Sequence, residues 1–245
     1  MRPSARAIAA VPFLALALLH VVLLLLEGAG VGVGDWATIT KGLLMPALLL
    51  AFLIGWLALR ADGPVAPAAA GADRMIGPAL VVWALAFSWL GDISLSVTEG
   101  AGFLLGLGFF LVAHVAWITA FVRVLGVRHP PRAALVYLLW LVVFVALLAP
   151  HTSALLFPVA LYGAVLALVA ALGLGGNRFT AWGSALFLVS DSLLGLHTFY
   201  PGFSPWQIDA VIMSGYLAGQ ALMAVGVLRH LAAARRRALV PGESR

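Results

Sequence analysis

Two aspartates, Asp92 and Asp191, lie inside stretches of sequence that are otherwise almost wholly apolar. An ionisable side chain in the middle of a bilayer costs about 2.5–3.5 kcal/mol on insertion scales, so such residues are candidates for a functional site. Two carboxyl groups that face each other can act as acid and base, because burial and a neighbouring negative charge both favour the protonated form of one of them. The structural alternative is that hydrogen bonds from nearby serines or the backbone make each aspartate a packing element.

Lys41 is the basic residue that fits this chemistry, because an ammonium group can neutralise a carboxylate or hold a lipid phosphate. The alternative is a lysine whose stem lies along apolar surface while its charge reaches the membrane interface. Tyr216 and Gln220 are four residues apart and share one helix face, so they can serve the same site or join helices by hydrogen bonds. His114 completes the set, although a buried histidine that donates to a backbone carbonyl is the simpler interpretation.

Metal chemistry is not expected. The chain has no cysteine, which excludes thiolate ligands and disulfides. His20, His114 and His197 could in principle join the two aspartates around an ion. However, the sequence has no pair of histidines four residues apart and no His-x-x-Glu-His pattern. We therefore expect neither a metal nor another cofactor.

The composition identifies the surroundings of these residues. Hydrophobic residues make up 64% of the chain and charged residues 9%, against about 45–50% and about 25% in soluble domains. A water-soluble fold cannot cover so much apolar surface with so few charges, whereas a bilayer removes that need. The net charge of +5 comes without a basic run interleaved with aromatic residues. We interpret it as the asymmetry of membrane loops and expect no nucleic-acid partner.

Eight segments are long and apolar enough to span a bilayer, which takes about 20 residues per helix. They are residues 7–26, 39–59, 75–95, 101–124, 133–149, 153–172, 180–196 and 207–228. The first follows Arg2 and Arg6 as in a signal peptide, but its length favours an uncleaved helix. None of the connecting segments resembles a linker to a soluble domain. The sequence therefore predicts an all-α, polytopic membrane protein, a bundle of eight transmembrane helices in a single domain over residues 1–245.

The basic residues predict the orientation of this bundle. If the N-terminus is cytoplasmic, thirteen of the fourteen Lys and Arg residues lie inside and Lys41 alone lies outside. This distribution follows the positive-inside rule. Both termini are then cytoplasmic, and the expected location is the cell membrane, which is the inner membrane in a bacterium.

The predicted topology places the polar candidates in the outer half of the bundle. Lipid exposure is costly for them, so we expect their side chains to converge on one interior cavity. The residues expected there are Lys41, Asp92, Asp191 and Tyr216, with His114 and Gln220 lining the deeper part.

The third and seventh predicted helices resemble each other. Residues 89–95 read WLGDISL and residues 188–194 read LVSDSLL, each with its aspartate after a small residue. Helices four apart run in the same direction, which fits a parallel repeat of four plus four helices about an axis along the membrane normal. A chance similarity is the alternative, because the matching segments are short.

Five short segments carry a resemblance to a known family. In chain order they are KGLLMP (41–46), SWLGD (88–92), GLGFFLVAH (106–114), GSALFLVSD (183–191) and MSGYLAGQ (213–220). On these segments the chain resembles the YhhN family, which includes the lysoplasmalogenases. Gly42 stands where the family often has proline, and Gly215 stands where it often has a polar residue.

The resemblance implies a membrane-embedded hydrolase that cleaves the vinyl ether bond of lysoplasmalogens. The substrate would be lysoplasmenylethanolamine or lysoplasmenylcholine. The products would be a fatty aldehyde and glycerophosphoethanolamine or glycerophosphocholine. The implied partners are therefore a lysophospholipid and the lipid bilayer. The implied residues are Asp92 and Asp191 for catalysis, and Lys41, His114, Tyr216 and Gln220 for substrate binding.

A transporter of lipids or small molecules is the alternative function. The same aspartate pair would then be a proton or ion relay. Transporters commonly have helices that are broken by Gly or Pro near the membrane midplane. The clearest interior proline here, Pro158, lies near the start of a predicted helix.

Overall fold

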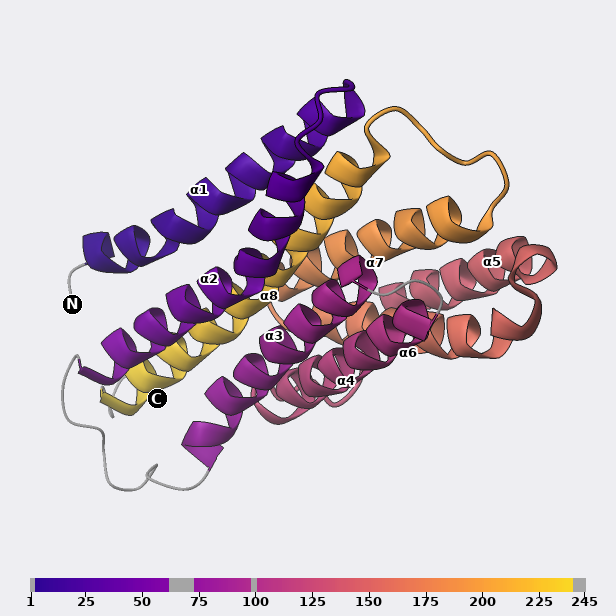
Figure 1. Cartoon of the computed structure of the whole chain (residues 1–245). Coiled ribbons are helices and arrows are strands. Elements are labelled where there is room, and N and C mark those ends of the chain that lie inside the picture. The colour runs from indigo at the N-terminus through magenta and orange to yellow at the C-terminus, as the bar shows by residue number, and fades with distance from the viewer. Residues whose placement is uncertain (1–2, 62–72, 98–100, 240–245) are drawn as a thin grey trace.

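The computed structural model describes residues 3–61, 73–97 and 101–239. Within these ranges the chain forms α-helices, two short 3-10 helices and no strand, which confirms the all-α class for the described part. Figure 1 shows the helices as an elongated bundle. They are α1 (Pro3–Gly28), α2 (Gly34–Ala61), α3 (Asp73–Val97), α4 (Ala101–Arg123), α5 (Leu135–Thr152), α6 (Leu156–Gly175), α7 (Arg178–Phe199) and α8 (Ile208–Leu239).

Seven helical stretches of the described chain are long and apolar enough to cross a membrane, so the protein is a multi-pass membrane protein. One of them, Arg132–Gly175, has 44 residues, about twice the roughly 20 that one crossing needs. It contains α5 and α6, which are joined by a 3-10 turn at Ser153–Leu155 and pack against each other. Eight separate crossings stay a prediction.

Helices that are consecutive in the sequence pack against each other, with the exception of α4 and α5 (Figure 1). Four pairs pack side by side, namely α1–α2, α3–α4, α5–α6 and α7–α8. In addition, α2 packs on α3, and α6 packs on α7. Helix α8 contacts α1, α2 and α3 in addition to α7, and α4 contacts α6. The two halves of the chain are therefore joined through α8 and through the contact between α4 and α6.

Helices α7 and α8 approach closely because glycines face each other across the contact. A Cβ atom added at Gly183 would lie 2.8 Å from the carbonyl oxygen of Gly219, and one at Gly219 would lie 2.9 Å from that of Gly183. Small residues at such contacts let backbones pack in membranes, where dispersion rather than the hydrophobic effect holds helices together.

The start of α7 is fixed by Asn177. Its side chain accepts hydrogen bonds from the backbone N–H groups of Phe179 and Thr180, and the Thr180 hydroxyl accepts one from the Asn177 N–H. This capping box satisfies N–H groups that a helix start leaves free. The Asn177 amide also donates to the carbonyl of Gly226 on α8 at 3.0 Å. The cap therefore sets the depth of α7, which carries Asp191, relative to α8, which carries Tyr216.

Polar and apolar residues are distributed as a bilayer requires. Polar side chains such as Thr40, Ser88, Thr180 and Ser184 are buried. The outward side chains of α5 are large and apolar, namely Leu135, Val136, Leu138, Leu139, Val142 and Val143. Lipid replaces water as the outer solvent of such a surface.

Candidate active site

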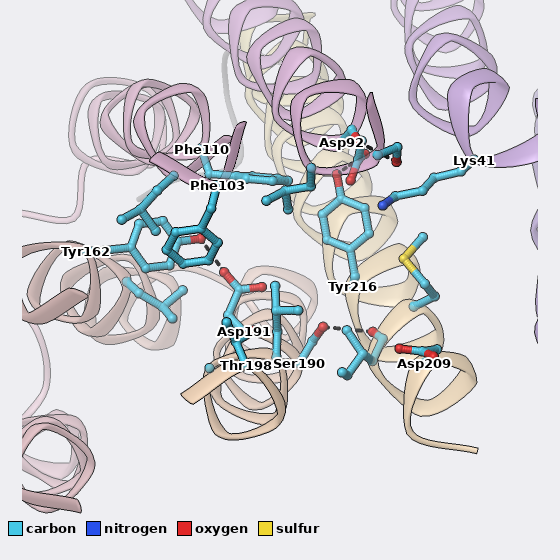
Figure 2. A pocket seen from close by; sticks show the side chains of 18 of the residues that line it. Lys41, Asp92, Phe103, Phe110, Tyr162, Ser190, Asp191, Thr198, Asp209 and Tyr216 are labelled. Carbon is cyan, nitrogen blue, oxygen red and sulfur yellow. Dashed lines mark hydrogen bonds between the residues drawn. The ribbon is translucent and has the colours of Figure 1, made fainter. Parts of the chain in front are cut away.

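A cavity of about 350 Å³ lies between the helices. Its size is near the lower end of the roughly 300–1,000 Å³ that is usual for small-molecule sites. Figure 2 shows its side chains. The four residues that the sequence predicted to converge all line this cavity: Lys41, Asp92, Asp191 and Tyr216.

Asp92 stands in the penultimate turn of α3 and is 4% exposed. The hydroxyl of Tyr216 on α8 donates to its Oδ2 atom at 2.7 Å. Lys41 reaches from α2 toward this pair (Figure 2), and its charge acts on Asp92. Asp92 is therefore a buried carboxyl group with one phenolic donor and one nearby cation.

Asp191 stands on α7 and is half-buried. The hydroxyl of Tyr162 on α6 donates to its Oδ2 atom. Asp92 lies close enough to act on it electrostatically, and Lys41 lies on the other side of Tyr216 (Figure 2). The two carboxyl groups therefore share one cavity and have different electrostatic surroundings.

Tyr162 is a site residue that sequence reasoning missed. It carries the one polar side-chain group of α6, whose sequence is LFPVALYGAVLALVAALGLG. A hydroxyl at membrane depth needs a partner, because the bilayer core has no water to supply one. The presence of a single polar residue in an apolar helix was therefore the signal that Tyr162 has a partner. The sequence could not identify that partner, because Asp191 is on another helix.

One end of the cavity is polar. Lys41 has no ion-pair partner among the residues that the structure describes. His20 of α1 is buried beside it and binds Thr40 through Nδ1 at 2.9 Å. Asp209 also lines the cavity, from the first turn of α8. The side chains that define this polar end are His20, Thr38, Lys41 and Asp209.

The other end of the cavity is apolar and lies among α4, α5, α6 and α7. Figure 2 shows Phe103 and Tyr162 on the side of Asp191 that is away from Lys41. Phe103 and Phe199 meet edge to face, with ring centroids 5.4 Å apart. We call this end the apolar arm, and its lining residues are Phe103, Phe144, Val159, Leu166, Leu194, Gly195 and Phe199.

Gln220 does not line the cavity, in contrast to the prediction. It is fully buried, donates to the Ser88 hydroxyl of α3 at 2.8 Å and accepts from the Trp117 indole of α4 at 3.2 Å. These bonds join α8 to α3 and α4 one turn from Asp92. Gln220 therefore joins helices by hydrogen bonds, which was the alternative interpretation of this residue.

His114 also lies behind the cavity wall rather than in it, which corrects the second predicted lining residue. Its Nδ1 atom lies 2.6 Å from the carbonyl oxygen of Phe110, so Nδ1 carries the proton and donates. The ring stacks on Phe187, with centroids 4.8 Å apart, and meets the edge of Tyr162. His114 therefore supports the Tyr162 ring from behind.

The described residues contain no group of three or more His, Asp or Glu side chains that could hold a metal ion. The chemistry open to the site is acid–base chemistry between the two aspartates. In each aspartate, a tyrosine hydroxyl donates to the Oδ2 atom. A free carboxyl oxygen that faces a cavity can give a proton to a bound molecule or take one from it.

Comparison with known proteins identifies relatives of the chain. The model of the YhhN family matches residues 36–227. The protein named lysoplasmalogenase TMEM86B from Rattus norvegicus is 33% identical over 150 residues, which cover 61% of this chain and 62% of that protein. Its namesake from Homo sapiens is 31% identical over 153 residues, which cover 61% and 64%. The chain thus matches somewhat under two thirds of the length of these relatives. No solved structure matches it.

Proposed function

The chain belongs to the YhhN family, and we propose that it is a membrane hydrolase that cleaves the vinyl ether bond of lysoplasmalogens. The products are a fatty aldehyde and glycerophosphoethanolamine or glycerophosphocholine. The observation that carries the proposal is a single cavity with a charged end, an apolar end and two tyrosine-bound carboxyl groups between them. The name of the two relatives supports the same reaction.

Vinyl ether hydrolysis needs three things from the protein. An acid gives a proton to the alkene carbon that is farther from the oxygen, and an oxocarbenium ion forms. Water then adds to this ion and loses a proton to a base, and the resulting hemiacetal collapses to aldehyde and alcohol. An anion beside the cationic carbon stabilises the step that forms it. Glycosidases use two carboxyl groups for closely similar chemistry.

We assign the anion to Asp92 and the acid to Asp191. Lys41 lies on the Asp92 side of the cavity (Figure 2), and a nearby positive charge favours the ionised carboxylate. Asp191 lies on the side of the cavity away from Lys41 (Figure 2) and adjoins the apolar arm, where a neutral carboxyl group is the less costly form. The hydroxyls of Tyr216 and Tyr162 each bind one carboxyl oxygen, which fixes the orientation of the two carboxyl groups in the cavity.

Lys41 also supplies the subsite for the phosphate of the head group. Its ammonium group lines the polar end and has no ion-pair partner in the described structure. A phosphodiester is the anion that a lysophospholipid brings to this place. A phosphate oxygen that accepts from the Lys41 ammonium would form a charge-assisted hydrogen bond, which is stronger than a neutral one.

The proposed topology has eight crossings, cytoplasmic termini and a site in the outer half. Arg60 in the last turn of α2, Arg123 in the last turn of α4 and Arg178 in the first turn of α7 all stand at helix ends that this topology puts on the cytoplasmic side. This arrangement supports the positive-inside assignment. Reporter fusions should read inside at Asn177 and outside at Phe203, and the reverse result would overturn it.

The test of function is aldehyde release by the purified, detergent-solubilised protein. A 1-alkenyl lysophospholipid is the substrate, and the 1-alkyl lysophospholipid of the same chain and head group is the matched control, because it lacks the alkene. We expect aldehyde from the first lipid alone, with one deuterium on carbon 2 when the reaction runs in D₂O.

A transporter would give a different result. It would release no aldehyde, and vesicles that contain it would show lipid or ion flux that Asp92→Asn and Asp191→Asn alter. Helix α2 continues without a break at Pro46, and α3 continues without a break at Pro78. These helices therefore differ from the broken helices that are common in transporters.

A further inference from the structure

We propose that the apolar arm receives the hydrocarbon chain of the substrate and that Gly195 and Phe144 set the chain length it accepts. The proposal rests on the function proposed above and adds the direction in which the lipid lies. The head group is at Lys41, and the chain runs past Asp191 into the space between α5, α6 and α7.

The separation of polarity along the cavity gives this direction. Lys41, Asp92 and Asp209 are on one side in Figure 2, and Phe103 and Tyr162 are on the other. A lipid with a charged head and one apolar chain matches this order, because a charge in the arm would lose its hydration without gaining a partner. The reverse placement would also set a hydrocarbon chain against the Lys41 ammonium.

The direction agrees with the roles of the two carboxyl groups. In a vinyl ether the carbon that takes the proton is on the chain side, and the carbon that becomes cationic is bonded to the head-group oxygen. Asp191 is one helical turn from Gly195 of the arm, and Asp92 adjoins Lys41 at the other end. The acid therefore meets the carbon to be protonated, and the carboxylate meets the carbon that becomes positive.

Gly195 and Phe144 both line the arm and are packed directly against each other there. A Cβ atom added at Gly195 would lie 2.8 Å from Cζ of the Phe144 ring. The ring cannot easily retreat, because it is buried and stacks on Trp140 with centroids 4.9 Å apart and planes 17° apart. A side chain at position 195 must therefore narrow the arm, whereas removal of the Phe144 ring must widen it.

The two changes should move chain-length preference in opposite directions. The measurement is kcat/KM for a series of 1-alkenyl lysophosphocholines of increasing chain length. Gly195→Ala should move the optimum to shorter chains, with about a fourfold loss for each methylene group that no longer enters the arm. Phe144→Ala should move it to longer chains. Gly108→Ala is the matched control and should leave the profile unchanged, because Gly108 faces open space on the outer surface of α4.

A binding measurement separates this proposal from the proposed reaction. Saturated 1-alkyl lysophosphocholines cannot be hydrolysed, so their chain-length profile for thermal stabilisation reports the arm alone. Opposite shifts in binding without any aldehyde release would uphold the arm and overturn the reaction. Hydrolysis with the same chain-length profile in wild type, Gly195→Ala and Phe144→Ala would overturn the arm. An equal loss for all chain lengths in both folded variants would overturn it as well.

Discussion

Asp92 and Asp191 receive the same kind of hydrogen bond and otherwise lie in different surroundings. Each accepts a hydrogen bond on Oδ2 from a tyrosine hydroxyl of another helix. The donor is on α8 for Asp92 and on α6 for Asp191. Asp92 is buried beside the Lys41 charge, and Asp191 is half-buried beside the apolar arm. Two similar carboxyl groups can therefore take different protonation states through what lies beyond their shared contact.

The residues one helical turn before the two aspartates also correspond to each other. Ser88, four residues before Asp92, bonds to Gln220 of α8, and Phe187, four residues before Asp191, stacks on His114 of α4. Gln220 and His114 each follow an aromatic residue by four, Tyr216 and Phe110. Phe110 has no hydroxyl to offer, and Asp191 instead receives its bond from Tyr162. This correspondence is what a parallel repeat of four plus four helices would produce, and the repeat stays a prediction.

The largest effect is expected from the aspartates themselves. Asp92→Asn and Asp191→Asn should each lower kcat for aldehyde release by about 10²–10⁴-fold, because an amide can neither give a carboxylic proton nor carry the negative charge. Asn keeps the shape and accepts the tyrosine hydroxyl, so folding should survive. Size-exclusion profiles and melting temperatures close to wild type are the control. Near-normal turnover by either folded variant would exclude that aspartate from the reaction.

The all-α membrane class and the presence of both aspartates in one cavity could be predicted from the sequence for one physical reason. A bilayer requires apolar segments of about 20 residues and makes a charged side chain within them costly. Both features can therefore be recognised in a hydropathy profile. The helix ends were less predictable. Helix α8 runs to Leu239 rather than residue 228, because a helix can continue through the basic residues that follow its apolar part.

The direction in which side chains point was the second feature that could not be predicted from the sequence. His114 and Gln220 were predicted to line the cavity, but both are buried behind its wall. Tyr162, His20 and Asp209 line the cavity but stand on helices whose rotation hydropathy cannot fix. The family match begins at residue 36, so it does not cover α1 and His20.

Lys41 is the second test of the comparison, because it distinguishes the two carboxyl groups. Lys41→Met should lower kcat/KM by about 10–100-fold, which is the size of one lost charged hydrogen bond of about 1.5–3 kcal/mol. Lys41→Arg keeps the charge and should recover most of the loss for phosphate-bearing substrates. A lysine that only reaches the membrane interface would tolerate both changes, and equal activity of Lys41→Met and wild type would remove the basis for assigning the anion to Asp92.

The tyrosines give a smaller effect and a ranking. Tyr162→Phe and Tyr216→Phe should each lower kcat by about twofold to tenfold, because one hydrogen bond is worth about 0.5–1.5 kcal/mol. Tyr162→Phe should be the more harmful, because Asp92 keeps the Lys41 charge when Tyr216 is changed, whereas Asp191 has no such support. Steady-state kinetics with one substrate ranks the two variants. The opposite order would contradict the contrast between the two carboxyl groups.

The smallest effect on catalysis is expected at the two deeper residues, where the sequence expectation and the structure differ. Gln220→Leu should destabilise the protein by about 1–3 kcal/mol, because the buried Ser88 hydroxyl and Trp117 indole lose their partner. His114→Phe should cost less, because a phenyl ring keeps the stacking on Phe187 and gives up only the bond to Phe110 of the same helix. Melting temperatures in detergent should therefore fall more for Gln220→Leu than for His114→Phe. At a temperature where both stay folded, kcat should remain close to wild type, since neither residue lines the cavity. A folded His114→Phe variant with a loss of kcat as large as that of Asp191→Asn would make His114 the proton donor and return it to the site that the sequence assigned.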